Sequence, residues 1–412
     1  MLDAEALLDS MAPIGWSLGL ERMEALSDEL GRPQDDFDSI HVVGTNGKSS
    51  VALMGAAIAG AHGVRAGCSI SPHVERWSQR AFVGGHEIAP DRFAAAVARA
   101  AEAAATVNRR LPADQQVTQF ELATAAAFVA LAEAGVELAM VEAGLGGRLD
   151  ASNTINSRVT ALTSVGLDHT EYLGGTEAEI AAEKLAVLRP GTTLVIGEVG
   201  DEVRDLAAAA ASRLDCRLID AGREAGPEYR PASPGPFQRR NFAVAKAAVG
   251  ACLGELDEAR TAAAAAGTVV SGRLEKVADD PPVYVDVAHN RAGAAALAEA
   301  LPEVSEGWPV IALIAVLDDK DAAGMLAELA PVLQYAVFTE LPAELLAARG
   351  RPGTGSRPAA ELLGLAERSG LTGERFTDPQ QALAAARRLA GSAGGVVLVA
   401  GSHFLASSID TG

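Results

Sequence analysis

Gly44-Thr45-Asn46-Gly47-Lys48-Ser49-Ser50 is the stretch from which the fold of this chain is best predicted. It follows the apolar residues 40–43 and precedes the apolar residues 51–58, so the order is strand, glycine-rich turn and helix. In such a turn the backbone N–H groups and the positive end of the helix dipole face an anion. Lys48 adds a full positive charge, and a serine hydroxyl can reach a magnesium ion. The stretch therefore predicts a binding site for a nucleoside triphosphate.

The loop departs from the strict Walker pattern, because Val42 occupies the position of its first glycine. It is a shortened relative of the P-loop, and fewer classes of nucleotide-binding enzyme fit this shorter form. The alternative interpretation is an ordinary Gly/Asn turn in front of a helix. The Gly-Lys-Ser core and its placement between strand and helix favour the phosphate site.

The composition predicts a packed protein of more than one domain. The chain has 412 residues, 49% of them hydrophobic and 21% charged, and is too long for one ordinary core. Its 54 acidic and 34 basic residues give a net charge of −20. This charge argues against broad nucleic-acid binding, which relies on a basic surface. It does not argue against ATP, because a phosphate site needs only a few local donors.

Cysteine usage and hydropathy predict a cytoplasmic protein. Cys68, Cys216 and Cys252 have no metal-like spacing, and their odd number gives no disulfide framework. The N-terminus lacks a basic start followed by an apolar core, and no apolar run is long enough to span a bilayer. We therefore expect no membrane partner.

Apolar runs alternate with helical stretches, which predicts an α/β fold with a mainly parallel sheet covered on both faces. The composition changes near residue 270, so we expect one domain over residues 1–270 and a smaller one over residues 271–412. The expected strands are residues 39–43, 138–141, 159–165 and 193–196 in the first domain, and 283–287, 310–316, 336–339 and 395–400 in the second.

Polar residues follow three of the expected strands. Glu142 ends one strand ahead of a glycine-rich turn that leads to Asp150, and His169 follows another. Ligands of an open α/β sheet bind at the carboxyl ends of its strands, where a carboxylate can hold magnesium. Asp286 and His289 close the first strand of the second domain in the same manner. Two interpretations of His169 stay open: a surface residue whose hydrogen bonds are satisfied within the protein, and a ligand.

Two basic residues admit ordinary interpretations. Lys184 lies on the helix after the His169 turn, and its spacing alone indicates a solvated helical lysine. Arg273 stands at the domain junction, where a surface arginine is the simpler interpretation. It could also reach a phosphate, because a guanidinium pairs with phosphate in a bidentate fork.

Taken in order, these segments resemble the folylpolyglutamate synthase and dihydrofolate synthase family, within the wider Mur-ligase group of ATP-dependent amide ligases. The resemblance runs almost the full length. Its pieces are residues 19–23 (GLERM), 44–48 (GTNGK), 71–73 (SPH), 118–121 (TQFE), 142–153, 166–169 (GLDH), 183–184 (EK), 272–275 (GRLE), 286–290 (DVAHN), 319–321 (DKD) and 401–402 (GS).

The resemblance implies a role for each site residue. Its fold would be a P-loop-type ATPase domain followed by a smaller, Rossmann-like glutamate-ligase domain. Lys48, Lys184, His169 and Arg273 would be catalytic. The ATP contacts would be residues 44–50, Asn241, Arg273, Asp286 and His289. Two magnesium ions would be held by Ser71, Glu142, His169 and Lys184. The pterin side of the substrate site would be formed by Thr118, Phe120 and Asp150. Lys184 would be carbamylated, which replaces the interpretation from its spacing.

The resemblance also implies the chemistry. The γ-phosphoryl group of ATP would pass to a carboxylate, and the α-amine of L-glutamate would attack the acyl phosphate. The acceptors would be dihydropteroate, a reduced folate or both, and we expect a monomer. The alternatives are a Mur-type peptidoglycan ligase with a UDP-linked substrate, a silent ATP- or folate-binding protein, and a P-loop GTPase or kinase.

Four residues depart from the family pattern. Ser49 replaces the usual glycine of the loop, and Gln79 precedes Arg80 where glutamate is common. Phe237 stands where histidine is frequent, and Arg291 where proline is usual. None of these changes removes an expected phosphate or metal ligand. Gln79 and Arg291 leave the pterin and amino-acid details open.

Overall fold

The strand ahead of the glycine-rich loop, β1 (Asp38–Val43), lies inside an eight-stranded sheet of order β4-β3-β2-β5-β1-β6-β7-β8. Neighbouring strands from β2 to β8 in this order pair in parallel, whereas the pairs β2–β3 and β3–β4 are antiparallel. The other bounds are β2 (Ala66–Ser69), β3 (Ala81–Val83), β4 (His86–Glu87), β5 (Leu138–Glu142), β6 (Val159–Leu162), β7 (Thr193–Ile196) and β8 (Arg217–Asp220).

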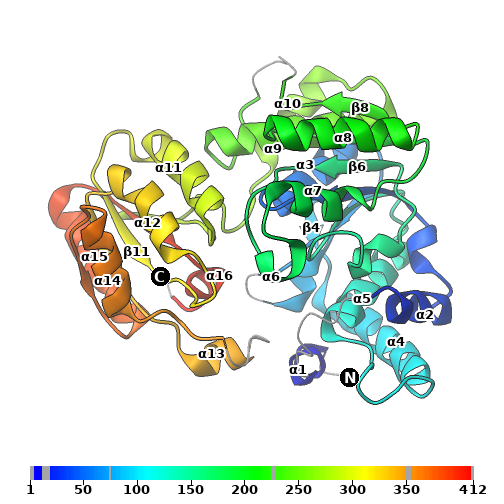
Figure 1. Cartoon of the computed structure of the whole chain (residues 1–412), viewed down its shortest axis with the longest axis horizontal. Helices are drawn as coiled ribbons and strands as arrows, with labels where there is room; N and C mark the ends of the chain where they lie inside the picture. The colour runs from blue at the N-terminus through cyan, green and yellow to red at the C-terminus, as the bar shows by residue number, and fades with distance from the viewer. Residues whose placement is uncertain (1–3, 12–18, 74–75, 224–228, 349–353, 410–412) are drawn as a thin grey trace. The chain divides into compact units, whose positions relative to one another are not determined.

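This sheet belongs to the first of two units in the computed structural model, which describes residues 4–11, 19–73, 76–223, 229–348 and 354–409. The N-terminal unit comprises Met1–Ala232 and Gln238–Thr268, and the C-terminal unit comprises Ser233–Phe237 and Val269–Gly412. Figure 1 shows both, coloured along the chain. The short segment Ser233–Phe237 thus belongs with the C-terminal unit, although it precedes residue 270 in the sequence.

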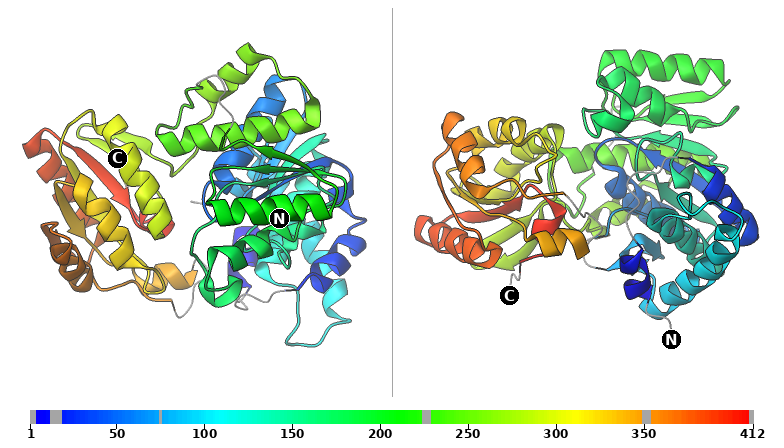
Figure 2. Two further views of the ribbon diagram at one scale, coloured as in Figure 1. Left: turned by 45° about the horizontal axis from the view of Figure 1, so that its top comes forward. Right: turned by 60° about the horizontal axis from the view of Figure 1, so that its bottom comes forward.

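Helices cover both faces of the first sheet (Figure 2). Ala139 and Val141 of β5 share a hydrophobic cluster with α5, whereas Met140 between them lies against Gly55 of α3. Consecutive strand residues point to opposite faces, so both faces of β5 are buried. The helices are α1 (Ala4–Ser10), α2 (Glu21–Glu29), α3 (Lys48–Ala61), α4 (Pro90–Asn108), α5 (Gln119–Glu133), α6 (Thr170–Leu173), α7 (Glu177–Leu185), α8 (Asp201–Arg213), α9 (Pro236–Leu253) and α10 (Glu258–Gly267).

The C-terminal unit has a six-stranded sheet of order β13-β12-β11-β14-β10-β9, parallel except for the pair β10 and β9. Its strands are β9 (Glu275–Asp279), β10 (Pro282–Val285), β11 (Val310–Ile314), β12 (Tyr335–Phe338), β13 (Gly373–Arg375) and β14 (Val396–Ala400). Its helices are α11 (Arg291–Ser305), α12 (Ala322–Leu329), α13 (Ala343–Ala348), α14 (Ala359–Arg368), α15 (Pro379–Ala393) and α16 (His403–Ala406).

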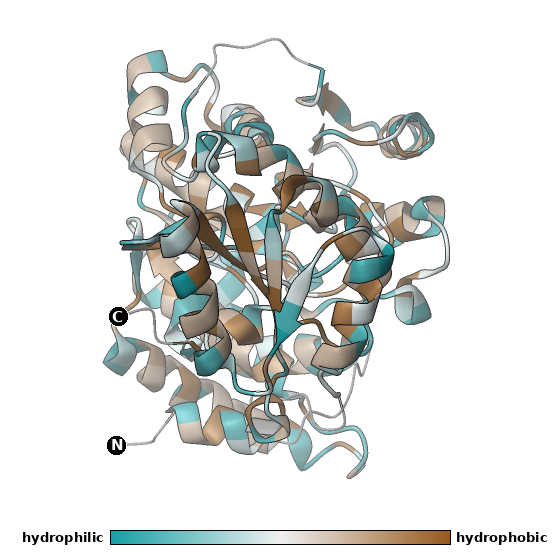
Figure 3. Cartoon of the chain, turned by 90° about the vertical axis from the view of Figure 1, so that its left-hand side faces the viewer, coloured by the Kyte–Doolittle hydropathy of each residue, from teal (hydrophilic) through white to brown (hydrophobic). Residues whose placement is uncertain are grey.

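Strand β11 explains why this second sheet is sandwiched between helices. Val310, Ala312 and Ile314 belong to one hydrophobic cluster, and Ile311 and Leu313 belong to another. Every residue of the strand is buried, which requires apolar cover on both faces. Figure 3 shows strands of this unit that are brown with hydrophobic residues, lying between helices of mixed colour. The prediction of an α/β fold, with a mainly parallel sheet in the first domain and a smaller α/β domain after it, is confirmed.

Candidate active site

The glycine-rich loop lies at the carboxyl edge of the first sheet, next to the ends of three other strands. β2, β5, β1 and β6 are consecutive neighbours, and all four run parallel. The segments that follow them therefore emerge at one edge. This topology gathers the loop after β1, Ser71 after β2, Glu142 at the end of β5 and the turn after β6.

Two glycines give the loop its shape. Gly44 has φ = 153° and Gly47 has φ = 85°, which side chains strongly disfavour. A Cβ atom on Gly44 would collide with the Thr163 hydroxyl, and one on Gly47 would collide with the Asn241 amide oxygen. The backbone therefore approaches its neighbours more closely than any other residue type would allow.

Hydroxyl groups after β6 hold the loop in place. The Thr163 hydroxyl donates to the carbonyl of Asn46 over 2.6 Å, and the Ser164 hydroxyl accepts from the Asn46 N–H over 3.1 Å. Thr45 donates its backbone N–H to the Ser164 carbonyl, and its hydroxyl donates to the Gly166 carbonyl. The expected strand 159–165 ends at Leu162, because the next two residues bond to this loop.

Glu142 is the carboxylate at the centre of this edge. It is 5% exposed, and its Oε2 accepts the Ser49 hydroxyl over 2.8 Å and the Ser71 N–H over 3.1 Å. Lys48 Nζ lies 4.0 Å from its Oε1 and donates to the Thr45 carbonyl. Ser49, a departure from the family pattern, thus contacts the expected metal-binding carboxylate. The Ser50 hydroxyl is buried and makes no hydrogen bond among the described residues.

Lys184 is not a solvated helical lysine. A capping box of Thr176 and Glu179 starts α7, and Lys184 near the end of this helix is only 3% exposed. Its Nζ donates to the Gly44 carbonyl over 2.9 Å. Burial and the charge of Lys48 lower the pKa of Lys184 to about 7. A share of its amine is therefore neutral at physiological pH.

His169 occupies the turn after β6 with φ = 50°. Its ring Nε2 lies 3.8 Å from Asp168 Oδ1, and its backbone N–H donates a hydrogen bond to the same oxygen. Among the described residues, no group of three or more His, Cys, Asp and Glu side chains is close enough to hold a metal ion.

The three residues expected on the pterin side are near one another. Thr118 caps α5, where its side chain and that of Glu121 form a capping box. Phe120 lies beside Gly144, since a Cβ there would meet the Phe120 ring and the Asp150 carboxylate. Asp150 is 4% exposed and accepts hydrogen bonds from Leu145 and Ser152.

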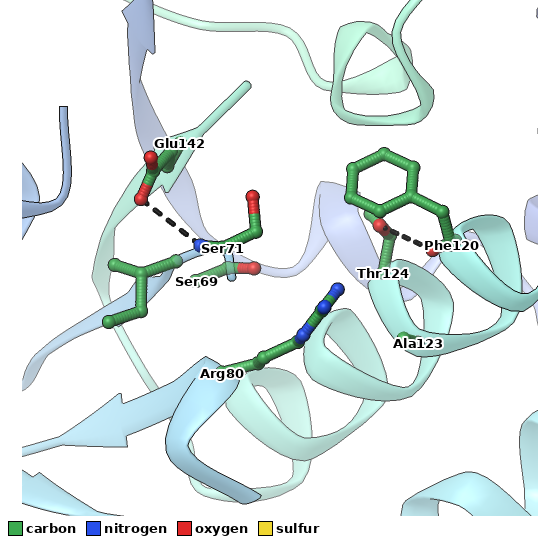
Figure 4. A pocket seen from close by; sticks show the side chains of 8 residues that line it. Ser69, Ser71, Arg80, Phe120, Ala123, Thr124 and Glu142 are labelled. Carbon is green, nitrogen blue, oxygen red and sulfur yellow. Dashed lines mark hydrogen bonds between the residues drawn. The ribbon is translucent and has the colours of Figure 1, made fainter. Parts of the chain in front are cut away.

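A pocket connects the Phe120 side with the Glu142 side, as Figure 4 shows. The Arg80 side chain reaches into it from below in this view. The lining residues are Ser69, Ile70, Ser71, Arg80, Phe120, Ala123, Thr124 and Glu142.

The C-terminal unit gathers its own expected residues at the end of β10. Asp286 is 3% exposed and accepts the N–H groups of Leu274 and Ala288. Burial raises the pKa of Asp286, while Arg273 opposes this shift. His289 Nδ1 bonds the Val287 carbonyl over 2.9 Å. In the N-terminal unit, Asn241 lies against Gly47 and donates to Gln238.

Sequence reasoning missed two arginines. Arg22 is buried and forms a bidentate ion pair with Glu121, at 3.0 and 3.1 Å from its Nε. It lies in the Gly-Leu-Glu-Arg-Met motif, which could have drawn attention to it. Arg80 follows Gln79, one of the departures from the family pattern, but only the fold brings it to the pocket.

Comparison with known proteins decides the family. A family model described as "Mur ligase, glutamate ligase domain" matches residues 272–403. The dihydrofolate synthase/folylpolyglutamate synthase of Mycobacterium tuberculosis is 35% identical over 379 residues, which cover 82% of this chain and 78% of that protein. This chain belongs to the dihydrofolate synthase/folylpolyglutamate synthase family. The resemblance drawn from the sequence is confirmed.

Further members of the family agree in sequence and structure. The Escherichia coli dihydrofolate synthase/folylpolyglutamate synthase is 31% identical over 332 residues, covering 77% of this chain and 76% of that protein. The folylpolyglutamate synthase of Mycobacterium tuberculosis complexed with ADP superposes with a TM-score of 0.87 at 32% identity, covering 98% of this chain and 96% of that one.

Two more solved structures carry ligands of interest. E. coli FolC in complex with DHPP and ADP has a TM-score of 0.83 at 29% identity, covering 98% of this chain and 95% of that one. The bifunctional enzyme from Yersinia pestis complexed with AMPPNP and a Mn ion has a TM-score of 0.82 at 27% identity, with the same coverage. In the described part of the present chain, no helix is both long and apolar enough to cross a membrane.

Proposed function

We propose that this chain is an ATP-dependent ligase that joins L-glutamate to dihydropteroate, to the γ-carboxyl group of a reduced folate, or to both. Its membership of the family supports this proposal, since relatives over most of its length carry both enzyme names. The observation that carries it furthest is the position of Glu142. This carboxylate stands between the phosphate loop and a pocket that Phe120 lines on its other side.

The reaction needs an activated carboxylate, because a free carboxylate is a poor electrophile. The γ-phosphoryl group of ATP passes to the substrate carboxylate, whose oxygen forms the new P–O bond while ADP leaves. The α-amine of glutamate then attacks the acyl carbon, and inorganic phosphate departs as the amide forms. Lys48 and the N–H groups of the loop hold the phosphates and offset their charge.

The residues around Glu142 fit a magnesium ion. Magnesium prefers oxygen ligands and keeps part of its water shell. The Glu142 carboxylate and the hydroxyls of Ser49 and Ser71 would hold it, with His169 as a further candidate. When bound, the ion would neutralise charge that develops on the transferred phosphoryl group.

Carbamylation of Lys184 would complete this donor set. The buried lysine amine would add to carbon dioxide, losing one proton and gaining a carboxylate-like group. Its burial and the nearby charge of Lys48 both favour the neutral amine that this addition needs. Conversion of a cation to an anion would also remove the repulsion between Lys184 and a metal ion. That the site holds two ions stays a prediction.

The C-terminal unit would bind glutamate and complete the nucleotide site. The family model that matches residues 272–403 is described as a glutamate ligase domain. Arg273, Asp286 and His289 are the residues we assign to nucleotide contact there. A two-unit enzyme can close over its substrates and exclude water from an acyl phosphate. The monomeric state and the cytoplasmic location stay predictions.

A substrate panel tests the proposed function. Purified protein receives ATP, magnesium and L-glutamate with dihydropteroate, tetrahydrofolate or a UDP-linked muramyl substrate, and released phosphate is measured. We expect release with one or both folates and not with the UDP-linked compound. Release without any amino acid would instead indicate a simple NTPase. Absence of release with both folates would refute the proposal.

A further inference from the structure

Arg80 is the basic residue of the pocket between Phe120 and Glu142. It ends the short helix η2 (Trp77–Arg80), just before strand β3. Figure 4 shows its guanidinium group pointing into the space between Ser71 and Thr124. A ligand that spans the pocket from Phe120 to Glu142 would therefore pass this group.

Neighbouring side chains fix the orientation of the Arg80 guanidinium. Its Nε donates to His73 Nδ1 over 3.1 Å, and its Cζ lies 4.3 Å from the centroid of the Trp77 ring. Trp77 is 5% exposed and donates its indole N–H to Asp9 over 2.9 Å. One edge and one face of the guanidinium are thus occupied. The two Nη atoms on the other edge are left to face the pocket.

The guanidinium has no carboxylate partner within the described residues. No Asp or Glu oxygen among them lies within 4.0 Å of its nitrogens, although acidic residues outnumber basic ones 54 to 34 in the whole chain. Burial lowers the pKa of Arg80 to about 10, so it is still protonated at neutral pH. The negative charge of Glu142, in the same pocket, favours the protonated guanidinium without contacting it, so an anion in direct contact with Arg80 would come from a ligand.

We propose that Arg80 binds the carboxylate of the pterin substrate that is to be phosphorylated. This inference rests on the proposed function and names a binding residue for the same site. Phe120 offers a stacking face to the aromatic part of the substrate, and Glu142 marks the end at which phosphoryl transfer occurs. Arg80, between them, would bind one carboxylate oxygen and leave the other directed at the γ-phosphate. Trp77 and His73 would act as positioning residues for Arg80.

The test compares two ligands that differ only in this carboxylate. The dissociation constants of dihydropteroate and of its analogue without the para-carboxyl group are measured with a non-hydrolysable ATP analogue present. The wild-type protein should prefer the acid by roughly 10- to 100-fold, as expected for a charge-assisted hydrogen bond. In Arg80→Met this preference should fall to about one, with nucleotide affinity unchanged. Arg76→Met serves as the control, because Arg76 instead pairs with Glu87 at the surface.

Each outcome decides between the inference and the proposed function. Preference for the acid that persists in Arg80→Met would overturn the inference and leave the proposed function intact. A wild-type protein that binds nucleotide but neither pterin would instead refute the proposed function. If Arg80→Met does not fold, Arg80→Gln and Arg80→Lys replace it. We then expect loss of the preference in Arg80→Gln and partial retention in Arg80→Lys, and an unchanged preference in Arg80→Gln overturns the inference.

Discussion

Lys184 Nζ donates a hydrogen bond to the carbonyl of Gly44 over 2.9 Å, although 140 residues separate the two in the sequence. The contact joins the buried end of α7 to the first residue of the phosphate loop. It shows one role of Lys184, and the carbamylation proposed above would add a second. The amine supports the loop backbone, and its carbamylated form would serve a metal ion.

Replacement of Lys184 tests the second role. Lys184→Ala should lose activity by roughly 100-fold or more, because the site loses a ligand for the ion that offsets phosphoryl charge. Acetate or propionate should restore part of the rate by entering the space of the missing carbamate. Lys276→Ala is the control, since Lys276 is 46% exposed and pairs with Asp279. Undiminished turnover in Lys184→Ala would contradict the assigned role.

The close approach at Gly47 predicts a sharp effect of one methyl group. Gly47→Ala should abolish nucleotide binding, because its Cβ would collide with the Asn241 amide at a backbone φ of 85°. Gly63→Ala provides a matched control, since Gly63 has φ = 84° and nothing lies within 4 Å of its added Cβ. Both variants bear the strain of a left-handed alanine, about 1–2 kcal/mol. Titration with ADP compares them, and equal affinities in the two variants would dismiss the packing argument.

The buried pair of Arg22 and Glu121 should stabilise the N-terminal unit and its pterin side. Their side chains are 10% and 5% exposed, and Glu121 also accepts the Thr118 N–H in the capping box of α5. Arg22→Met leaves an uncompensated buried carboxylate, which should cost about 3–5 kcal/mol of unfolding free energy. Weaker binding of dihydropteroate should accompany this loss, since Thr118 and Phe120 begin the same helix.

A surface pair supplies the comparison for Arg22. Arg158 and Asp38 are 56% and 55% exposed, so Arg158→Met should cost at most about 1 kcal/mol. Denaturant unfolding of both variants measures the difference. If Arg22→Met loses no more unfolding free energy than Arg158→Met, the buried pair stabilises the fold no more than an exposed ion pair does.

His41 predicts a loss of stability in mild acid. The residue is fully buried in β1, its Nε2 bonds the Ser152 hydroxyl over 2.8 Å, and burial lowers its pKa from 6.5 to about 3. Below pH 6.5 the unfolded chain binds a proton that the folded chain refuses, so stability falls as the pH falls. At pH 5 this difference amounts to about 2 kcal/mol.

Unfolding at pH 7.5 and pH 5 measures this contribution. His41→Gln should lose less stability between the two values than the wild type, because it has no imidazole to protonate. His86→Gln, at an exposed position, should behave as the wild type does. The same acid loss in His41→Gln would mean that another group causes it.

Much of the site could be predicted because parallel strands end at a common edge. The apolar runs before Lys48 and Glu142 predicted two such strands. Because strands that alternate with helices run parallel, their carboxyl ends, and with them Lys48 and Glu142, were expected at the same edge. Strand β2 was missed, because its Ala-Gly-Cys-Ser sequence has little β-propensity and becomes a strand only between β3 and β5. Secondary-structure patterns could not place Arg80, whose position depends on the packing of Trp77 and His73.

Lys184 shows the limit of local patterns most clearly. Its spacing indicates a solvated lysine, whereas the structure buries it beneath the phosphate loop. Only the family resemblance predicted an unusual lysine there. Burial is a tertiary property, set in this case by the angle at which α7 returns to the sheet, and a single helix pattern does not contain that angle.

The fate of one oxygen atom tests the central claim most directly. Dihydropteroate labelled with ¹⁸O in its carboxylate is turned over with ATP, magnesium and L-glutamate, and the released phosphate is analysed by mass spectrometry. Passage through an acyl phosphate transfers one ¹⁸O atom from the carboxylate to each phosphate. We predict one ¹⁸O per phosphate, together with an equal amount of the glutamate conjugate. Phosphate without ¹⁸O, released by attack of water on ATP, would contradict the account.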